Sequence, residues 1–518
     1  MGPYRKSRLI SRRRVLSAGL GAGTALLCMG RAWGAGGMQH GPSSTPAGNA
    51  SSTALPFESA PLVEPEVRRA AGGQLSTTLR IRYAYQDIGG YRLHLRSYEG
   101  TTPGPTLRAR PGDVLRIRLV NELPPNRDSH PSDRNLPNRL NTTNLHVHGM
   151  HVSPDGIADN VLREMEPGQA YEIEVPIPAS HPPGTYWYHP HRHGSANVQV
   201  ASGMAGAIIL EGDFANVPQI ASARERVLIL QQLAFDALGT VESFDTVWPT
   251  QAARLFTVNG QLRPTITMRP GEIQRWRIIH AGFHDSTPIG LDRHLLHEIA
   301  ADGIALPGVR AQQSILVVPG QRTDVLVQAG ASGSYALRSL PFNQGEGDNR
   351  TWVLANVVVA GAPMAMDLPT TLPPGPLVPI RTDELTGTRR LTFSTQAPAT
   401  GGDDFREFRF MMDGRLFDHH RIDHRIRLGS VEEWEIANLD EADHPFHIHT
   451  NPFLVTRING VALAEPIWRD TVNVRGHGTV TVRSRFEDFT GLFVLHCHIF
   501  NHEDIGMMQV VEVYKAPR

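Results

Sequence analysis

Short stretches that alternate apolar and polar side chains recur along the chain from residue 76 onwards. They include TLRIRYAY, DVLRIRLV, YEIEVPI, TDVLVQA and TVTVRS. Successive side chains of a β-strand point to opposite faces, so a period of two predicts strands with one buried and one exposed face. Gly and Pro separate these stretches, and long patterns of helical period are scarce. We therefore predict an all-β chain folded as sandwiches or barrels.

One phrase returns three times. It reads PTLRARPGDVLRIRLVN from Pro105, PTITMRPGEIQRWRIIHA from Pro264 and HRIRLGSVEEWEIAN from His424, each predicted as a strand, a tight Gly turn and a strand. The spacing of about 160 residues is much longer than a solenoid repeat. We interpret the phrases as three copies of one whole β-domain, in keeping with the ~100–200 residues of an ordinary domain. The expected domains cover residues 76–214, 222–372 and 380–518.

The amino terminus has the layout of an export signal. A basic segment precedes an apolar stretch, residues 15–29, and small residues around Ala35. The pair Arg12 and Arg13 resembles a twin-arginine signal, and the alternative is an ordinary secretory signal with surplus arginines. The apolar stretch is shorter than the ~20 residues that span a bilayer. We therefore expect residues 1–35 to be removed, which leaves a periplasmic or extracellular protein without a membrane anchor.

Charge and cysteine content narrow the class of partner. Lys plus Arg number 50 and Asp plus Glu 51, with no basic run after the amino terminus, so neither a nucleic acid nor a membrane surface is expected. We expect a monomer that acts on a small molecule. Residues 36–75, rich in Gly, Ser, Pro, Thr and Ala, are expected to form a flexible linker. Because Cys28 lies in the expected signal, the mature chain has one thiol, Cys497, and no internal disulfide.

Four segments carry the spacing His-x-His: NLHVHGMH, YWYHPHRHG, HPFHIHTNPF and VLHCHIFNH. Residues i and i+2 of a strand share a face, so each pair directs two imidazoles the same way. A single pair could equally be surface or core histidines, but four pairs supply enough nitrogen donors for several copper ions. The eight candidate ligands are His146, His148, His189, His191, His447, His449, His496 and His498.

The one mature thiol points to a different centre. Cys497 lies between two of the paired histidines, so strand parity turns its sulfur to the opposite face. His444 is an odd number of residues from the third pair and also faces away if its strand stays regular. His502 and Met507 follow Cys497 by five and ten residues, as a returning loop would allow. Two imidazoles, a thiolate and a weak thioether form the ligand set of a blue electron-transfer copper.

The segments HVHG, YWYHPHRHG, HPFHIHTNPFLV and HCHIFNHEDIGMM resemble the four copper signatures of the multicopper oxidases, the family of laccases, bilirubin oxidase and bacterial cuprous oxidases. The resemblance extends over nearly all of the mature chain. It implies three cupredoxin-like Greek-key β-barrels, with a type 1 (blue) copper in the third and a cluster of one type 2 and two type 3 coppers between the first and third. The second would be a copper-free spacer and a candidate wall of the substrate site.

Carried over residue by residue, the resemblance also implies roles. His146 and His447 would hold the type 2 copper, and the other six paired histidines the type 3 pair. Substrate would lose an electron near solvent-facing His444 or His502, and the backbone of Cys497 would lead that electron to the cluster. After four such transfers, O2 would be reduced to water.

Two acids align with carboxylates that the family places near the cluster. Glu503 follows His502 directly, whereas Asp159 aligns only approximately and Asp155 is a rival. Each acid could deliver protons to the oxygen chemistry or could merely orient a ligand imidazole through a hydrogen bond. Other histidines lack a strand-paired partner and are expected to be exposed or hydrogen-bonded, namely His151, His181, His193, His419, His420 and His424.

Three functions compete for this ligand set. A non-enzymatic copper-binding or scaffold protein is disfavoured because the chain retains every ligand of the signatures. An oxidase of Cu(I) or Fe(II) would be indicated by a methionine-rich insertion, but the thirteen methionines are scattered, although Asp470 could still contribute to a metal site. The sequence therefore favours a laccase-like oxidase of phenols and similar organic reductants.

Overall fold

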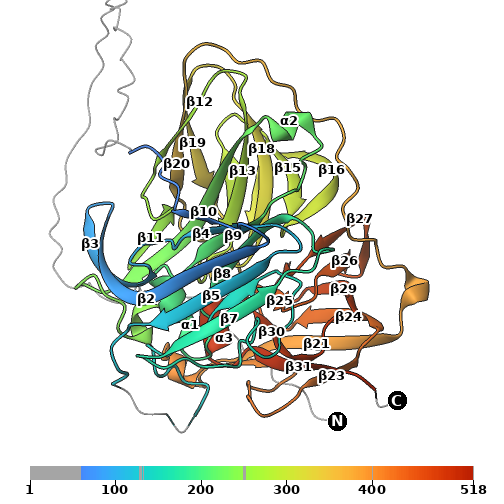
Figure 1. The fold of residues 1–518 in the computed structure, drawn as a ribbon. Coiled ribbons are helices and arrows are strands. Elements are labelled where there is room, and N and C mark those ends of the chain that lie inside the picture. Colours follow the sequence, from blue (N-terminus) through green and yellow to red (C-terminus); the bar gives the residue numbers. More distant parts are fainter. Residues whose placement is uncertain (1–59, 128–130, 132, 249–252, 400, 517–518) are drawn as a thin grey trace, which may run out of the picture. The chain divides into compact units, whose positions relative to one another are not determined.

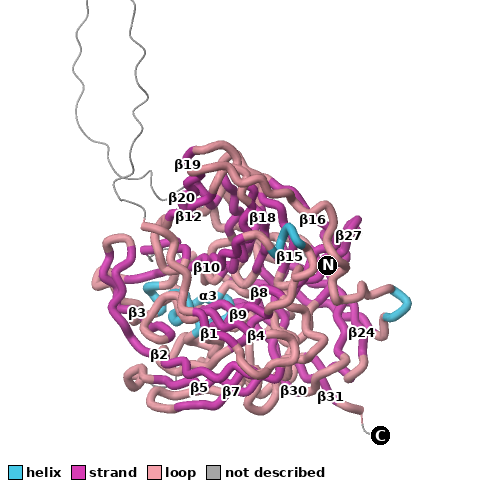
Figure 2. Tube along the Cα trace, turned by 45° about the horizontal axis from the view of Figure 1, so that its top comes forward, coloured by secondary structure: helices cyan, strands magenta, loops and turns pink. Residues whose placement is uncertain are grey.

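The structure of the protein is a computed structural model that describes residues 60–127, 131, 133–248, 253–399 and 401–516. The expected export signal and residues 36–59 of the expected linker lie outside these residues. Strands and loops make up nearly all of the described chain, and its helices are few and short (Figure 2). The all-β prediction is confirmed.

The first pair of sheets has four strands in the order β3-β2-β5-β7 and five in the order β1-β4-β9-β8-β6. In β2, Leu79 and Ile81 point into the core while Arg80 and Arg82, which alternate with them, are exposed, as the pattern predicts. The elements are β1 Val67–Arg69, β2 Gln74–Ile88, β3 Tyr91–Tyr98, β4 Thr106–Ala109, β5 Val114–Asn121, β6 His146–His148, β7 Ala170–Pro176, β8 Gly184–His189, β9 Gly206–Leu210, α1 Ala196–Ala201 and α2 Pro218–Ala221.

The expected flexible linker ends earlier than residue 75. Strand β1 pairs in parallel with β4, with Val67 opposite Thr106. Arg68 also donates a hydrogen bond of 2.6 Å to the carbonyl of Thr78. Backbone pairing of this kind does not require apolar side chains, so composition alone placed the boundary too late.

The second pair of sheets has the strand orders β11-β10-β13-β18-β15-β16 and β12-β20-β19-β14-β17. Its elements are β10 Arg224–Phe235, β11 Ala253–Val258, β12 Thr265–Met268, β13 Ile273–His280, β14 Thr287–Leu291, β15 Leu296–Ala301, β16 Ile304–Gln312, β17 Ile315–Val317, β18 Arg322–Gln328, β19 Gly333–Ser339, β20 Val353–Val359 and the 3-10 turn η2 Phe244–Thr246.

The third pair of sheets has the strand orders β22-β21-β24-β29-β26-β27 and β23-β31-β30-β25-β28, which repeat the order of the second pair strand for strand. Its elements are β21 Gly387–Gln396, β22 Arg409–Met412, β23 His424–Arg427, β24 Ser430–Asn438, β25 His444–Ile448, β26 Phe453–Ile458, β27 Val461–Arg469, β28 Thr471–Val474, β29 Thr479–Phe486, β30 Gly491–Cys497, β31 Met508–Tyr514, α3 Phe500–Asp504 and the 3-10 turns η3 Thr382–Glu384 and η4 Phe405–Glu407.

The three copies of the repeated phrase form β4 and β5, β12 and β13, and β23 and β24. The turn between each two strands contains a glycine with positive φ, +94° at Gly112, +80° at Gly271 and +88° at Gly429, a conformation that favours glycine. The repeat therefore encodes the same strand, turn and strand in each pair of sheets.

Helices α1 and α3 join the first and third pairs of sheets, where they lie side by side (Figure 1). Asp504 of α3 accepts hydrogen bonds from the backbone N–H groups of Gly194 and Asn197, at 2.7 and 2.8 Å, at the start of α1. Burial raises the pKa of Asp504 to about 8. This contact fixes the segment after β8 against the segment after β30, and both segments carry His-x-His pairs.

Candidate metal centre

The eight paired histidines converge on one buried place between the first and third pairs of sheets. Strand β6 pairs with β8, with His146 opposite His189, and β25 pairs with β30, with His447 opposite His496. All eight side chains are buried. We call them the histidine cluster: His146, His148, His189, His191, His447, His449, His496 and His498.

Six members of the cluster fall into two groups of three. The Nε2 atoms of His191, His449 and His496 lie 3.0, 3.1 and 3.3 Å apart. The second group is His148, His189 and His498. Imidazole nitrogens about 2.0–2.1 Å from a shared metal in tetrahedral array would be about 3.3 Å apart. Three mutually close nitrogens therefore have the spacing of one metal's ligands.

Unpartnered nitrogens support the same interpretation. The Nε2 atoms of His146, His189 and His447 are buried and accept or donate no hydrogen bond. Their other ring nitrogens are held from outside: His146 Nδ1 by Asp159 at 3.0 Å, His447 Nδ1 by the carbonyl of Asp470 at 2.7 Å and His189 Nδ1 by the carbonyl of the next residue at 2.9 Å. Buried polar atoms are seldom left unpaired, and metal-bound histidines usually have such outer partners. The cluster fits copper ions.

The charge state of the cluster also suits metal binding. Burial, and then the neighbouring imidazoles, lower the pKa values of His146, His449 and His498 well below the usual range of histidine. These rings are therefore neutral at physiological pH. The neutral imidazole is the form that donates a lone pair to a metal.

A second group, which we call the cysteine site, consists of His444, Cys497 and His502. The sulfur of Cys497 lies 3.5 Å from His444 Nδ1 and 3.7 Å from His502 Nδ1, and the two nitrogens are 3.2 Å apart. Met507 is buried in the same apolar core as Cys497, and its carbonyl accepts a hydrogen bond from the Cys497 amide at 3.1 Å. The structure thus brings together the thiol of Cys497 and the imidazole of His444, which strand parity turns away from the cluster, with the imidazole of His502 from the returning loop.

The expectation that His444 or His502 faces solvent is wrong. His444 is 0% exposed and His502 is 1% exposed. Asp440 accepts a hydrogen bond of 2.8 Å from His444 Nε2, and the ring of Phe410 lies against the His502 ring. Asp440 lies in the loop just before His444, whereas Phe410 comes from β22.

Carboxylates lie on the outer side of the cluster. Glu503 is fully buried, with Oε2 3.1 Å from His496 Nδ1 and Oε1 3.4 Å from His191 Nδ1. Asp159 lies 3.0 Å from His146 Nδ1, and burial raises the pKa of this carboxyl to about 8. The rival Asp155 is exposed and caps a turn at Gly156. Geometry therefore favours Asp159 over Asp155 as the acid beside the cluster.

Arg322, which was not among the residues predicted from the sequence, lies near the cluster and comes from β18 of the second pair of sheets. Its guanidinium donates to both carboxylate oxygens of Asp470, at 2.8 and 2.6 Å, and to the carbonyls of Thr185 and Gly320, both at 3.1 Å. Asp470 in turn lies 3.1 Å from His148 Nε2. Asp470 is buried and engaged, so it offers no site to an outside metal ion.

Through Arg322, the second pair of sheets helps to position residues around the histidine cluster. It is therefore more than the copper-free spacer that the sequence predicted. Two charged residues, Arg322 and Asp324, in the first half of a strand that continues as VLV were the available signal. The partner of Arg322 is 148 residues away. A sequence pattern could not identify that partner.

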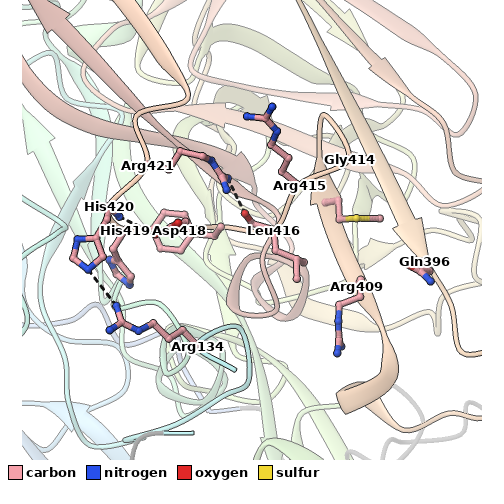
Figure 3. A pocket seen from close by; sticks show the side chains of 12 residues that line it. Arg134, Gln396, Arg409, Gly414, Arg415, Leu416, Asp418, His419, His420 and Arg421 are labelled. Carbon is pink, nitrogen blue, oxygen red and sulfur yellow. Dashed lines mark hydrogen bonds between the residues drawn. The ribbon is translucent and has the colours of Figure 1, made fainter. Parts of the chain in front are cut away.

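The histidines set aside in the sequence form other contacts. His151 lies 2.7 Å from Asp488, and His181 Nε2 accepts a hydrogen bond from the His151 amide. His419 and His420 line a basic cavity of about 770 Å3. His420 Nε2 lies 3.3 Å from Arg134 Nη1, and Figure 3 shows these two side chains facing each other. Separately, no helix among the described residues is both long and apolar enough to cross a membrane.

Family models described as multicopper oxidase match residues 134–214, 236–360 and 388–517, more than half of the chain. The chain is 26% identical to a laccase of Bacillus stratosphericus over 471 residues, which cover 81% of this chain and 90% of the laccase. It is also 26% identical to the cell division protein FtsP of Salmonella typhimurium over 427 residues, 80% of this chain and 84% of FtsP.

Among solved structures, the fold is similar to that of a multicopper oxidase of Campylobacter jejuni, a metallo-oxidase. The TM-score is 0.72 at 25% identity, over 88% of this chain and 94% of the other. Each pair of sheets is thus a cupredoxin-like β-barrel. The family matches and the copper-fitting clusters lead to one conclusion: this chain belongs to the multicopper oxidases, copper enzymes that reduce O2 with electrons taken from a reducing substrate.

Proposed function

We propose that the protein is an exported, laccase-like multicopper oxidase whose reductants are phenols and similar organic molecules. The observation that carries this proposal is the aromatic cover of the cysteine site, where Phe410 rather than a thioether or a carboxylate lies against His502. Phe410 is itself only 5% exposed, so a reductant would reach His502 through neighbouring aromatic side chains, which stack with aromatic molecules and give little affinity for a hydrated metal ion. The match to the laccase of Bacillus stratosphericus supports the same substrate class.

We assign the copper ligands from the groups described above. His444, Cys497 and His502, with Met507 as the weak axial ligand, would hold the type 1 copper. His146 and His447 would hold the type 2 copper. The type 3 pair would be held by one group of three each, His148, His189 and His498 for one ion and His191, His449 and His496 for the other.

The roles of the residues follow from this assignment. When bound, copper supplies one-electron redox chemistry and the binding of O2. Cys497 is joined through the backbone to its neighbours His496 and His498. This connection would give electrons a short covalent path from the cysteine site to the histidine cluster. Glu503 and Asp159 lie within 3.4 Å of outer ring nitrogens and would hold the protons that water formation consumes.

A metallo-oxidase is the second candidate, and one observation favours it. The side chain of Asp440 is 15% exposed and accepts the hydrogen bond from His444 Nε2. A carboxylate therefore lies between the His444 imidazole and the surface. Fe(II) or Cu(I) bound there would be close to the type 1 ligands. The similarity to the Campylobacter metallo-oxidase supports this alternative. A non-enzymatic scaffold role is disfavoured because the cluster is complete, although one relative is a cell division protein, FtsP.

Three further expectations are part of the proposal. The domains would be residues 76–214, 222–372 and 380–518, with the start of the first extended to include β1. The protein would be exported by the twin-arginine route to the periplasm or the cell exterior. It would act as a monomer.

One comparison tests the proposed function. The copper-loaded protein and its Cys497→Ser variant are assayed for O2 consumption with a phenol, a nonphenolic dye, Fe(II) and Cu(I). Faster turnover of the phenol and the dye, abolished together with the blue absorption in the variant, is the expected result. Turnover confined to Fe(II) or Cu(I) would establish the metallo-oxidase instead, and a variant that stays blue would refute the type 1 assignment.

A further inference from the structure

An outside molecule cannot touch either imidazole of the proposed type 1 site, because both are buried. Asp440 covers the outer nitrogen of His444. The ring of Phe410 lies nearly flat against His502, with 4.1 Å between ring centroids and 16° between ring planes. An organic reductant must therefore deliver its electron through the residues that cover these imidazoles.

Aromatic rings continue outward from Phe410. Phe408 lies nearly parallel to it, with centroids 6.0 Å apart, and Trp248 packs against Phe408 at 5.3 Å. Phe405 follows at 6.0 Å from Trp248, and Phe244 at 4.8 Å from Phe405. We call these five side chains the ring stack. Because each ring contacts the next, the stack forms a continuous packed path that starts at the cysteine site.

The outer end of the ring stack opens into a cavity. Phe244 and Phe405 line one part of this cavity together with Leu136, Leu140 and several prolines, polar and charged side chains line the rest, and its volume is about 660 Å3. Small-molecule sites in proteins typically enclose about 300–1,000 Å3 between apolar and aromatic walls. The cavity therefore has the size and the lining to hold a molecule of one or two aromatic rings.

The charges around the cavity select among reductants. Arg96, Arg127 and Arg406 line it together with a single carboxylate, Glu242. Arg406 forms ion pairs with two aspartates and Arg96 lies 3.8 Å from Glu242, so the lining carries one positive charge in excess, that of Arg127. An excess of positive charge disfavours Fe(II) and Cu(I) and accepts a neutral or anionic arene.

We propose that this cavity seats the phenolic reductant and that the ring stack carries its electron to His502, an inference that rests on the proposed function. With copper bound at the cysteine site, the phenol would give up one electron, which the type 1 copper would accept. Its hydroxyl proton passes to the carboxylate of Glu242 and from there to water, and the phenoxyl radical leaves the cavity. The phenylalanine rings provide contact for the transfer and are not themselves oxidised.

The test uses the copper-loaded protein without O2, with bleaching of the blue absorption followed by stopped flow. Phe408→Leu interrupts the ring stack without touching a copper ligand. Phe489→Leu is the matched control, since Phe489 is also a half-buried phenylalanine of the third barrel but packs against His151 instead. Leu136→Trp fills the cavity. Each variant is reduced by guaiacol and, separately, by Fe(II), and the type 1 reduction potential is measured for each.

Phe408→Leu should slow reduction by guaiacol about tenfold while its reduction by Fe(II) and its potential stay unchanged. Leu136→Trp should raise the guaiacol concentration at half-maximal rate and leave Fe(II) unaffected. The proposal is overturned if Phe408→Leu behaves like Phe489→Leu, or if guaiacol and Fe(II) slow equally. A wild-type protein that Fe(II) bleaches and guaiacol does not would overturn the laccase-like function itself, which is a different outcome.

Discussion

Replacement of Arg322 by methionine tests whether the second barrel helps to build the copper cluster. The side chain is fully buried and spans all three barrels, through the carbonyls of Thr185 and Gly320 and the carboxylate of Asp470. Methionine fills similar space but leaves Asp470 without its counter-charge. Because Asp470 lies 3.1 Å from His148, its displacement would also move a cluster ligand.

The size of the effect follows from burial. Removing one partner of a buried ion pair costs about 3–5 kcal/mol, because the remaining charge stays desolvated and unpaired. Burial raises the pKa of Asp470 to about 6, and Arg322 limits that rise. Without Arg322 the carboxyl should be protonated more readily. We therefore expect Arg322→Met to lose the full ~3–5 kcal/mol of unfolding free energy, as estimated above, at pH values above about 7. The loss should be smaller at about pH 5, where the Asp470 carboxyl is mostly protonated in both proteins.

Urea unfolding of the copper-free protein measures this loss, since metal binding adds its own folding free energy. Arg338→Met is the control: Arg338 and Asp292 form an exposed pair in the same barrel, with side chains 44% and 38% exposed, and should contribute less than about 1 kcal/mol. Electron paramagnetic resonance of the reloaded variant should show a weakened type 2 copper signal, because the carbonyl of Asp470 also holds His447, a proposed ligand of that copper, at 2.7 Å. A loss no larger than that of Arg338→Met, with an intact type 2 signal, would refute the role given to Arg322.

Three further outcomes are expected. Met507→Leu should raise the potential of the type 1 copper while the protein stays blue, as measured by redox titration, because a thioether stabilises oxidised copper more than no donor does; a lowered potential would argue against the axial role. Glu503→Gln should slow reoxidation by O2 more than reduction by substrate in stopped flow, and equal slowing would contradict proton supply. Burial lowers the pKa of His284, but Glu346 and Asp285 outweigh burial and raise that pKa to about 9. The pKa of histidine in the unfolded chain is about 6.5. Up to about 3 kcal/mol of stability that is present below pH 6.5 should therefore be lost as the pH rises through 9. Urea unfolding at the two pH extremes should show that loss in the wild type and not in His284→Gln.

The residues that the sequence identified correctly are those whose geometry is local. A period of two fixes which face a strand residue occupies, so the directions of the histidine pairs and of Cys497 follow from spacing alone. The division of the pairs into groups of three depends on how strands of two barrels face each other, and spacing carries no information about that. The covering of His502 by Phe410 and the reach of Arg322 to Asp470 are contacts between distant segments. Such contacts are decided by packing rather than by any pattern in a window of sequence.

Strand β30 presents the sulfur of Cys497 on one face and the imidazole of His496 on the other. A shift of one residue in its pairing with β25 and β31 would exchange the two faces, placing a thiolate among the imidazoles and an imidazole in the apolar core. Insertions and deletions within β30 should therefore be far less tolerated than substitutions of its packing residues. The length of this strand, and not only its sequence, is a requirement for keeping the two copper centres chemically distinct.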